Sequence, residues 1–161
     1  MRVLTLILAL TLIACGPSSH TTGQTPLACK KVFQPDRVDF DLPANFAIDE
    51  VIEVEKCGFQ HHPNISFSER IVSGNEYPIP ALLKELRRSD DDYWSVHMVL
   101  LIKEVVERDK FHADVMRDRE SITKDVNLAL DHVTAQDPRE RMQDLRDGIE
   151  MYFMKEDGMR F

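Results

Sequence analysis

The sequence has little of what a membrane-spanning or nucleic-acid-binding protein needs. Its longest apolar run, from Val3 to Ile13, covers about 11 residues, whereas a helix that crosses the hydrocarbon core needs about 20. Basic residues are in the minority, because 20 Lys and Arg stand against 28 Asp and Glu and the formal net charge is -8. An acidic surface repels phosphate groups, so we expect no nucleic-acid partner.

The sequence also lacks the short motifs that mark common catalytic sites. It contains no G-x-S-x-G, no glycine-rich phosphate loop and no H-E-x-x-H. These absences disfavour nucleophilic, phosphoryl-transfer and zinc-protease chemistry, and no cofactor is expected. They do not exclude an enzyme, because catalytic groups can converge from distant segments. Enzymatic activity therefore stays open as the less favoured interpretation.

The N-terminal apolar run follows a single cation, Arg2, and ends in Leu12-Ile13-Ala14-Cys15. This pattern resembles a bacterial lipoprotein signal peptide with its lipobox. The resemblance covers residues 1–16 alone. It implies that residues 1–14 are removed and that Cys15 carries several acyl chains, palmitate among them, which anchor the protein at a bilayer. A residue other than aspartate after the cysteine is similar to the outer-membrane sorting pattern, so the implied place is the periplasmic face of that membrane. Ordinary secretion is the alternative.

Residues 15–28 are predicted to form a lipidated, flexible tether, because they are rich in Gly, Pro, Ser and Thr and have too few apolar side chains to fold. Cys29 and Cys57 remain in the body after it. Since the export signal implies an oxidising compartment, we expect these two cysteines to form a disulfide. Two buried thiols too far apart to bond are the alternative.

Residues 29–161 are expected to form one globular domain of mixed character. Pro and Gly punctuate residues 29–79, which predicts short strands and loops: a strand over 64–72, and a strand over 46–56 for which helical spacing is the alternative. Residues 80–157 have the charged, Leu- and Met-bearing texture of helices. The predicted fold class is α+β, mainly helical, with a small strand-containing region packed on a bundle of three to four helices. An all-α fold is the alternative.

Capping signals divide the first part of the helical half. A short helix is predicted over 81–88, with Pro80 in its opening turn. Ser89 is predicted to cap the next helix and Asp92 to reach back from the third position. That helix, Trp94 to Val106, is apolar nearly all round, which indicates burial on several sides.

A single helix from Asp92 to Thr134 would be about 65 Å long at about 1.5 Å per residue, which is too long for a compact domain. We therefore predict a break between Arg108 and Ser121. Asp137, followed by a proline, is the predicted N-cap of the last helix. That helix should run to about Glu156, before Gly158. No internal repeat is found in the sequence.

The histidines give weak signals for chemistry. His61 and His62 are the one adjacent pair and the best metal candidates, but no further ligands at a matching spacing accompany them. His97 lies on the most apolar segment, where a hydrogen-bonded core histidine is more common than a ligand or base. His112 and Met116 are one helical turn apart, but a copper site is disfavoured because the methionines suit ordinary packing. We expect no metal.

The function favoured by these patterns is a membrane-anchored periplasmic lipoprotein that binds another envelope protein without catalysing a reaction. An immunity or inhibitor protein is one specific form of this hypothesis. The alternatives are an envelope enzyme, with a metal at His61 and His62 as one form, and a lipoprotein that binds a small ligand in a pocket between its helices and its strands.

Overall fold

The computed structural model describes residues 27–34, 37–38, 42, 45–61 and 66–158 of the chain. The predicted signal peptide, Cys15 and nearly all of the predicted tether lie outside these residues. In the described part the chain forms seven α-helices, one 3-10 turn and two strands of two residues each. Their bounds are α1 Leu27–Val32, β1 Phe33–Gln34, β2 Arg37–Val38, α2 Ile48–His61, α3 Ser68–Ser73, α4 Ile79–Leu86, α5 Asp92–Val106, η1 Asp109–Phe111, α6 His112–His132 and α7 Gln136–Glu156.

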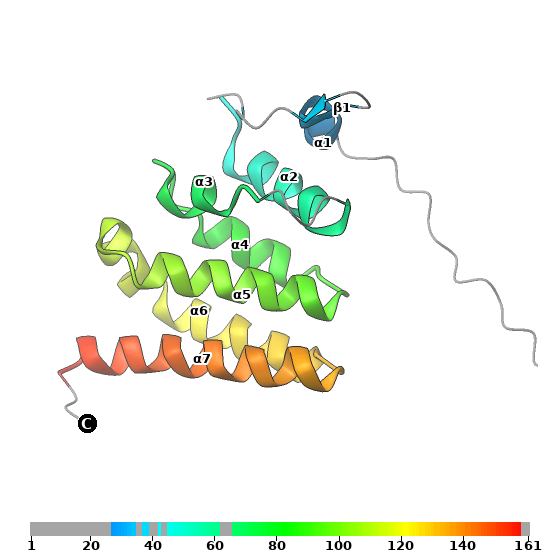
Figure 1. The fold of residues 1–161 in the computed structure, drawn as a ribbon. Coiled ribbons are helices and arrows are strands. Elements are labelled where there is room, and N and C mark those ends of the chain that lie inside the picture. Colours follow the sequence, from blue (N-terminus) through cyan, green and yellow to red (C-terminus); the bar gives the residue numbers. More distant parts are fainter. Residues whose placement is uncertain (1–26, 35–36, 39–41, 43–44, 62–65, 159–161) are drawn as a thin grey trace, which may run out of the picture.

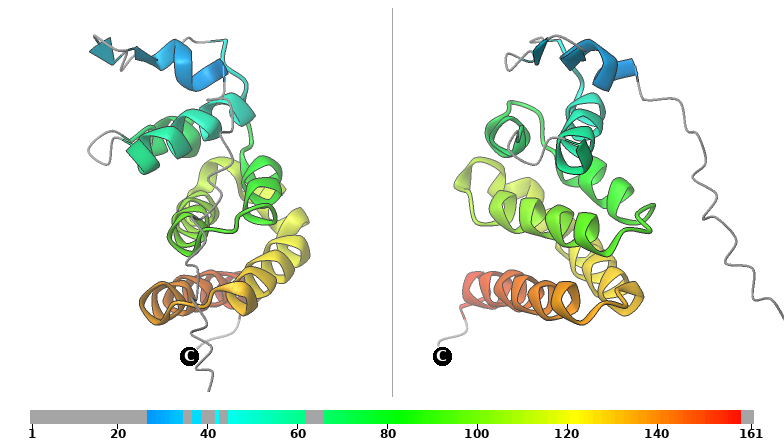
Figure 2. Two further views of the ribbon diagram at one scale, coloured as in Figure 1. Left: turned by 90° about the vertical axis from the view of Figure 1, so that its right-hand side faces the viewer. Right: turned by 45° about the vertical axis from the view of Figure 1, so that its right-hand side comes forward.

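The helices form a stack of three pairs (Figure 1). The pairs are α2 with α3, α4 with α5, and α6 with α7. Helices α2, α4 and α6 contact one another in succession, and so do α3, α5 and α7, so each pair packs on the next through both of its helices. Two further views show the pairs one above another, with α1 against α2 at one end and α7 at the other (Figure 2). Such stacking of helix pairs is the arrangement found in α-solenoids.

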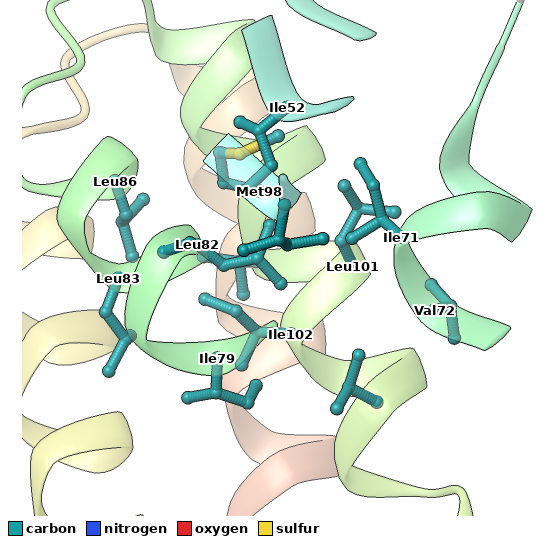
Figure 3. Packing of buried hydrophobic residues seen from close by; sticks show 14 of the residues in the cluster. Ile52, Ile71, Val72, Ile79, Leu82, Leu83, Leu86, Met98, Leu101 and Ile102 are labelled. Atoms are coloured by element: carbon teal, nitrogen blue, oxygen red, sulfur yellow. The ribbon is translucent and has the colours of Figure 1, made fainter. Parts of the chain in front are cut away.

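Helix α5 lies at the centre of the core. It packs against α3, α4, α6 and α7, which explains why its sequence is apolar nearly all round. Figure 3 shows this packing where side chains of α2, α3, α4 and α5 meet. The labelled residues are Ile52, Ile71, Val72, Ile79, Leu82, Leu83, Leu86, Met98, Leu101 and Ile102, all buried.

The fold is mainly helical, as predicted, but both predicted strands are wrong. Residues 46–56 fall largely within helix α2, where Ile48, Val51, Ile52 and Glu55 follow helical spacing and are buried together. β-Branched side chains favour strands in general. This segment is nevertheless helical, because a helix buries its apolar residues on one continuous face.

The second predicted strand, over 64–72, is replaced in its described part by helix α3. The adjacent residues Ile71 and Val72 of α3 are both fully buried. In a half-exposed strand, successive side chains point to opposite faces, so one of the two would be exposed. The extended pairing in the described ranges is a short antiparallel one, in which Phe33 faces Val38. No strand layer packs on the helices of the described part.

The start of α5 differs in detail from the sequence prediction. Helix α4 runs over residues 79–86 rather than 81–88, with Pro80 in its first turn as expected. The N-cap of α5 is Asp91 and not Ser89, because the Asp91 carboxylate accepts a hydrogen bond from the Trp94 N–H at 3.0 Å. Ser89 instead bonds to the Asp91 backbone.

The later helix boundaries follow the sequence more closely. The predicted break is present, since α5 ends at Val106 and α6 begins at His112 after the turn η1. Helix α7 begins at Gln136, so the prediction of Asp137 as its N-cap is wrong. It ends at Glu156 before Gly158, as expected, and this glycine has a φ of 76°, a value that favours glycine.

Candidate functional site

The predicted metal candidates do not form a metal site in the described part of the chain. His61 is the last residue of α2 and is exposed, and His62 lies outside the described residues. Across the described ranges, no group of three or more His, Cys, Asp or Glu side chains is placed to hold a metal ion.

The two body cysteines connect the end of the stack. Cys29 lies on α1 and Cys57 on α2, and both are buried. Their Cα atoms are 6.2 Å apart and their sulfur atoms lie at bonding distance, which is the pairing that the sequence predicts. The pair fixes the short helix α1 against α2. Helix α1 begins at Leu27, so it includes the last two residues of the predicted tether, 27 and 28.

A buried carboxylate, Glu55, joins α2 to α3 and α5. Its side chain is 2% exposed. The Oε1 atom accepts hydrogen bonds from the hydroxyls of Ser66 at 3.0 Å and Ser68 at 2.7 Å, and lies 2.8 Å from Nε2 of His97. The Oε2 atom accepts the backbone N–H of Phe67. Four donor groups therefore converge on one side chain.

These contacts keep Glu55 ionised. Burial by itself raises the pKa of the Glu55 carboxyl, but the hydrogen bonds from His97, Phe67 and Ser68 outweigh it and hold the pKa below its usual range. His97 also stacks on Phe59, with ring centroids 5.1 Å apart. It is thus the hydrogen-bonded core histidine that the sequence indicates.

The hydrogen bonds of the Glu55 cluster are arranged as in a structural network and not as in a catalytic triad. In a catalytic triad the imidazole lies between the hydroxyl and the carboxylate. Here both serine hydroxyls donate to Glu55 itself, so neither is activated by His97. Glu55 is not among the residues predicted from the sequence. Helical spacing over 46–56 would have indicated it, because that spacing places Glu55 on the same face as Ile48, Val51 and Ile52.

A second polar contact group lies beside it. The indole N–H of Trp94 donates to Glu85 at 3.1 Å, and Lys56 pairs with the same carboxylate oxygen at 2.7 Å. The Lys56 ammonium lies 5.8 Å from the centroid of the Trp94 ring. These contacts tie α2, α4 and α5 together near the middle of the stack.

A cavity lies between the end of α4, the start of α5 and the second half of α6. We call it the α4–α6 cavity. Its volume of about 540 Å³ is within the range of small-ligand sites. It is lined by Leu86, Arg87, Ser89, Asp90, Asp92, Ser95, Asp125, Leu128, Ala129, His132 and Val133.

The cavity is lined by both acidic and apolar residues. The acidic residues are Asp90, Asp92 and Asp125, and the cation Arg87 lies among them. Asp125 is 6% exposed, and its Oδ2 accepts a hydrogen bond from Arg87 at 2.7 Å. Arg87 is much more open, with a side chain 52% exposed. Among the apolar lining residues, Leu128 is 46% exposed.

Asp92, at the edge of the cavity, links two distant segments of the chain. Its Oδ2 accepts the backbone N–H groups of Thr134 at 3.0 Å and Ala135 at 2.8 Å, and the Thr134 hydroxyl at 3.1 Å. The bond from Ala135, supported by those from Thr134, lowers the pKa of the Asp92 carboxyl. Asp92 therefore joins the start of α5 to the chain just before α7, a role that the sequence analysis did not foresee.

His112 and Met116, one helical turn apart on α6, have separate contacts. His112 Nδ1 lies 3.0 Å from the Tyr152 hydroxyl, and its Nε2 lies 3.7 Å from Glu156. Burial, with the nearby Glu156 and Asp109, raises the pKa of Tyr152. Met116 packs against the core. None of these side chains lines the cavities found in the described part of the chain.

None of the helices in the described ranges is long and apolar enough to cross a membrane. Comparisons of the chain with protein-family models, with curated proteins and with solved structures found no match. The class that the geometry defines is a stack of helix pairs with an acidic, partly apolar cavity at one edge.

Proposed function

We propose that this protein is a lipid-anchored module of the bacterial cell envelope, held at the periplasmic face of the outer membrane through Cys15, whose helical body binds another envelope protein. The anchor rests on the resemblance of residues 1–16 to a lipoprotein signal. The tether between Cys15 and α1 leaves the body within reach of partners near the membrane.

The observation that carries the binding function is the stack of helix pairs with the α4–α6 cavity at its edge. Stacks of this kind commonly present extended binding surfaces, because successive pairs expose equivalent helices side by side. Exposed Leu128 beside a buried carboxylate gives the cavity the apolar and polar groups from which specific interfaces are made.

Binding of a small ligand is the second candidate. The volume of the α4–α6 cavity, about 540 Å³, favours it, because cavities of this size bury a small molecule. A small ligand would protect the body against unfolding in the absence of any other protein. A protein partner would not be needed for that effect, so thermal unfolding of the purified body with extracts of small molecules separates the two candidates.

The proposed function is tested in cells of the source bacterium with the whole chain and a Cys15→Ala variant. Labelling with a palmitate analogue should mark the wild-type protein and not the variant. Chemical crosslinking should join the anchored protein to one partner, and the joined product should be lost or strongly reduced in Cys15→Ala. Label that persists in the variant would contradict the anchor, and the absence of any joined product would contradict the binding function.

A further inference from the structure

We propose that the α4–α6 cavity binds a cationic side chain, the ammonium of a lysine or the guanidinium of an arginine, presented by the protein partner. This inference rests on the proposed function and names the chemistry of its interface.

The charge of the cavity is the first argument. Three carboxylates, Asp90, Asp92 and Asp125, line it together with one permanent cation, Arg87. The cavity therefore keeps an excess of negative charge, and it attracts a cation in preference to an anion. Charge complementarity of this kind selects partners and speeds their encounter.

The second argument is the condition of Asp125. A buried carboxylate is stabilised by hydrogen bonds to both oxygens, and Asp125 is buried to 6% exposure. Arg87 bonds to Oδ2, and no other described residue donates a hydrogen bond to this side chain. The Oδ1 atom is not one of the fully enclosed side-chain atoms that lack a partner, so it is open to solvent and can accept a hydrogen bond from a further donor. A lysine or arginine side chain supplies a charged donor, which makes the stronger kind of hydrogen bond.

The third argument is the apolar lining. Leu86, Leu128, Ala129 and Val133 line the cavity together with the carboxylates, and Leu128 and Ala129 lie on the same face of α6 as Asp125. Lysine and arginine carry an apolar stem below the charged group, and that stem packs on apolar surface while the head reaches a carboxylate. The cavity therefore matches both parts of such a side chain. A bare metal ion would gain no binding energy from contact with the apolar side chain of Leu128.

The test uses the whole folded body and a small probe, N-acetyl-lysine methylamide, followed by two-dimensional NMR. The dissociation constant of so small a probe is expected to be on the order of 1 mM. Its neutral isostere, N-acetyl-norleucine methylamide, should bind at least about tenfold more weakly because it has no charge. Equal binding of the two probes, or shifts confined to residues outside the cavity, would overturn the proposal.

Substitutions test which residues of the cavity bind the probe. Asp125→Asn should weaken the lysine probe about tenfold, whereas Asp144→Asn, an exposed carboxylate on α7 outside the cavity, should leave binding unchanged. Leu128→Ser provides a second variant, at a half-exposed position that leaves the buried carboxylate unchanged, and it should weaken binding of the probe about threefold. Arg87→Gln should tighten it several-fold, because it removes the positive charge that repels the cationic probe. Unchanged affinity in Leu128→Ser and Arg87→Gln would overturn the proposal.

The source of the cation is decided by a second probe. If free hexylamine binds at least about tenfold more tightly than the lysine probe, the cavity takes a small amine and the partner side chain is the wrong ligand. If the Asp125→Asn and Leu128→Ser variants give as much crosslinked product with the partner as the wild type does, the cavity inference is overturned and the proposed function still stands. Probe binding with no crosslinked partner would instead overturn the proposed function.

Discussion

The substitution Glu55→Gln tests the buried network that joins α2, α3 and α5. A glutamine has the same shape as glutamate, so the packing of the site is preserved. It carries one carbonyl oxygen and one amide N–H₂ group in place of two carboxylate oxygens. If the carbonyl keeps the contacts of Oε1 with Ser66, Ser68 and His97, the amide group faces the backbone N–H of Phe67, and two donors then oppose each other.

The expected loss is about 3 kcal/mol in the free energy of unfolding. One buried N–H without an acceptor costs about 1 to 3 kcal/mol, and the contacts that remain lose the strength that the ionised acceptor gave them. Glu53→Gln is the matched control, because Glu53 is exposed on the same helix, and its effect should stay within about 0.5 kcal/mol.

The assay is urea unfolding followed by fluorescence of the single tryptophan, Trp94, which is buried in this region. The pH dependence provides a second readout. The folded pKa of Glu55 lies below its usual value of 4.5, so its ionised form stabilises the fold above that pH and the stabilisation is lost as the pH falls below it. The difference between wild type and Glu55→Gln should be full above about pH 5 and shrink in acid. A Glu55→Gln effect no larger than that of Glu53→Gln would refute this reasoning.

Three further changes have defined outcomes. Cys57→Ser should lower the free energy of unfolding by about 3 kcal/mol in urea titration under oxidising conditions, since it opens the loop that the disulfide closes, and an unchanged midpoint would contradict the pairing. Asp92→Ala should cost about 1 kcal/mol in thermal unfolding, because the N–H of Ala135 loses its acceptor; no loss would contradict that contact. Gly148→Ala should stabilise the protein by about 0.5 kcal/mol, because the added methyl group meets the flexible end of Lys103 and the helix gains propensity; a clear loss of stability would show that Lys103 cannot move aside.

The helical half of the chain could be predicted from the sequence because its signals extend over several turns. The break between α5 and α6 follows from the length that one continuous helix would have, and the end of α7 follows from its apolar stripe and from Gly158. Residues 46–56 were ambiguous for a physical reason. A run such as Ile48, Val51 and Ile52 satisfies the helical period, while its β-branched residues also suit a strand, and only the packing of α2 on its neighbours resolves the choice.

The candidate site could not be predicted, because its parts are distant in the sequence. The α4–α6 cavity depends on the approach of Arg87 to Asp125, which lie on different helices and carry no local motif. The same is true of Asp92, which looked like an ordinary residue of a helix start and instead bonds to the chain before α7. Contacts of this kind appear only when the helix pairs stack.

The most direct test of the account is photo-crosslinking in cells from two single positions of the anchored protein, Leu128 in the α4–α6 cavity and Asp144 on α7. A photoreactive amino acid at Leu128 should join the protein to one partner in the membrane fraction, and the same group at Asp144 should not. Equal products from both positions, or none from Leu128, would contradict a partner that docks at this cavity.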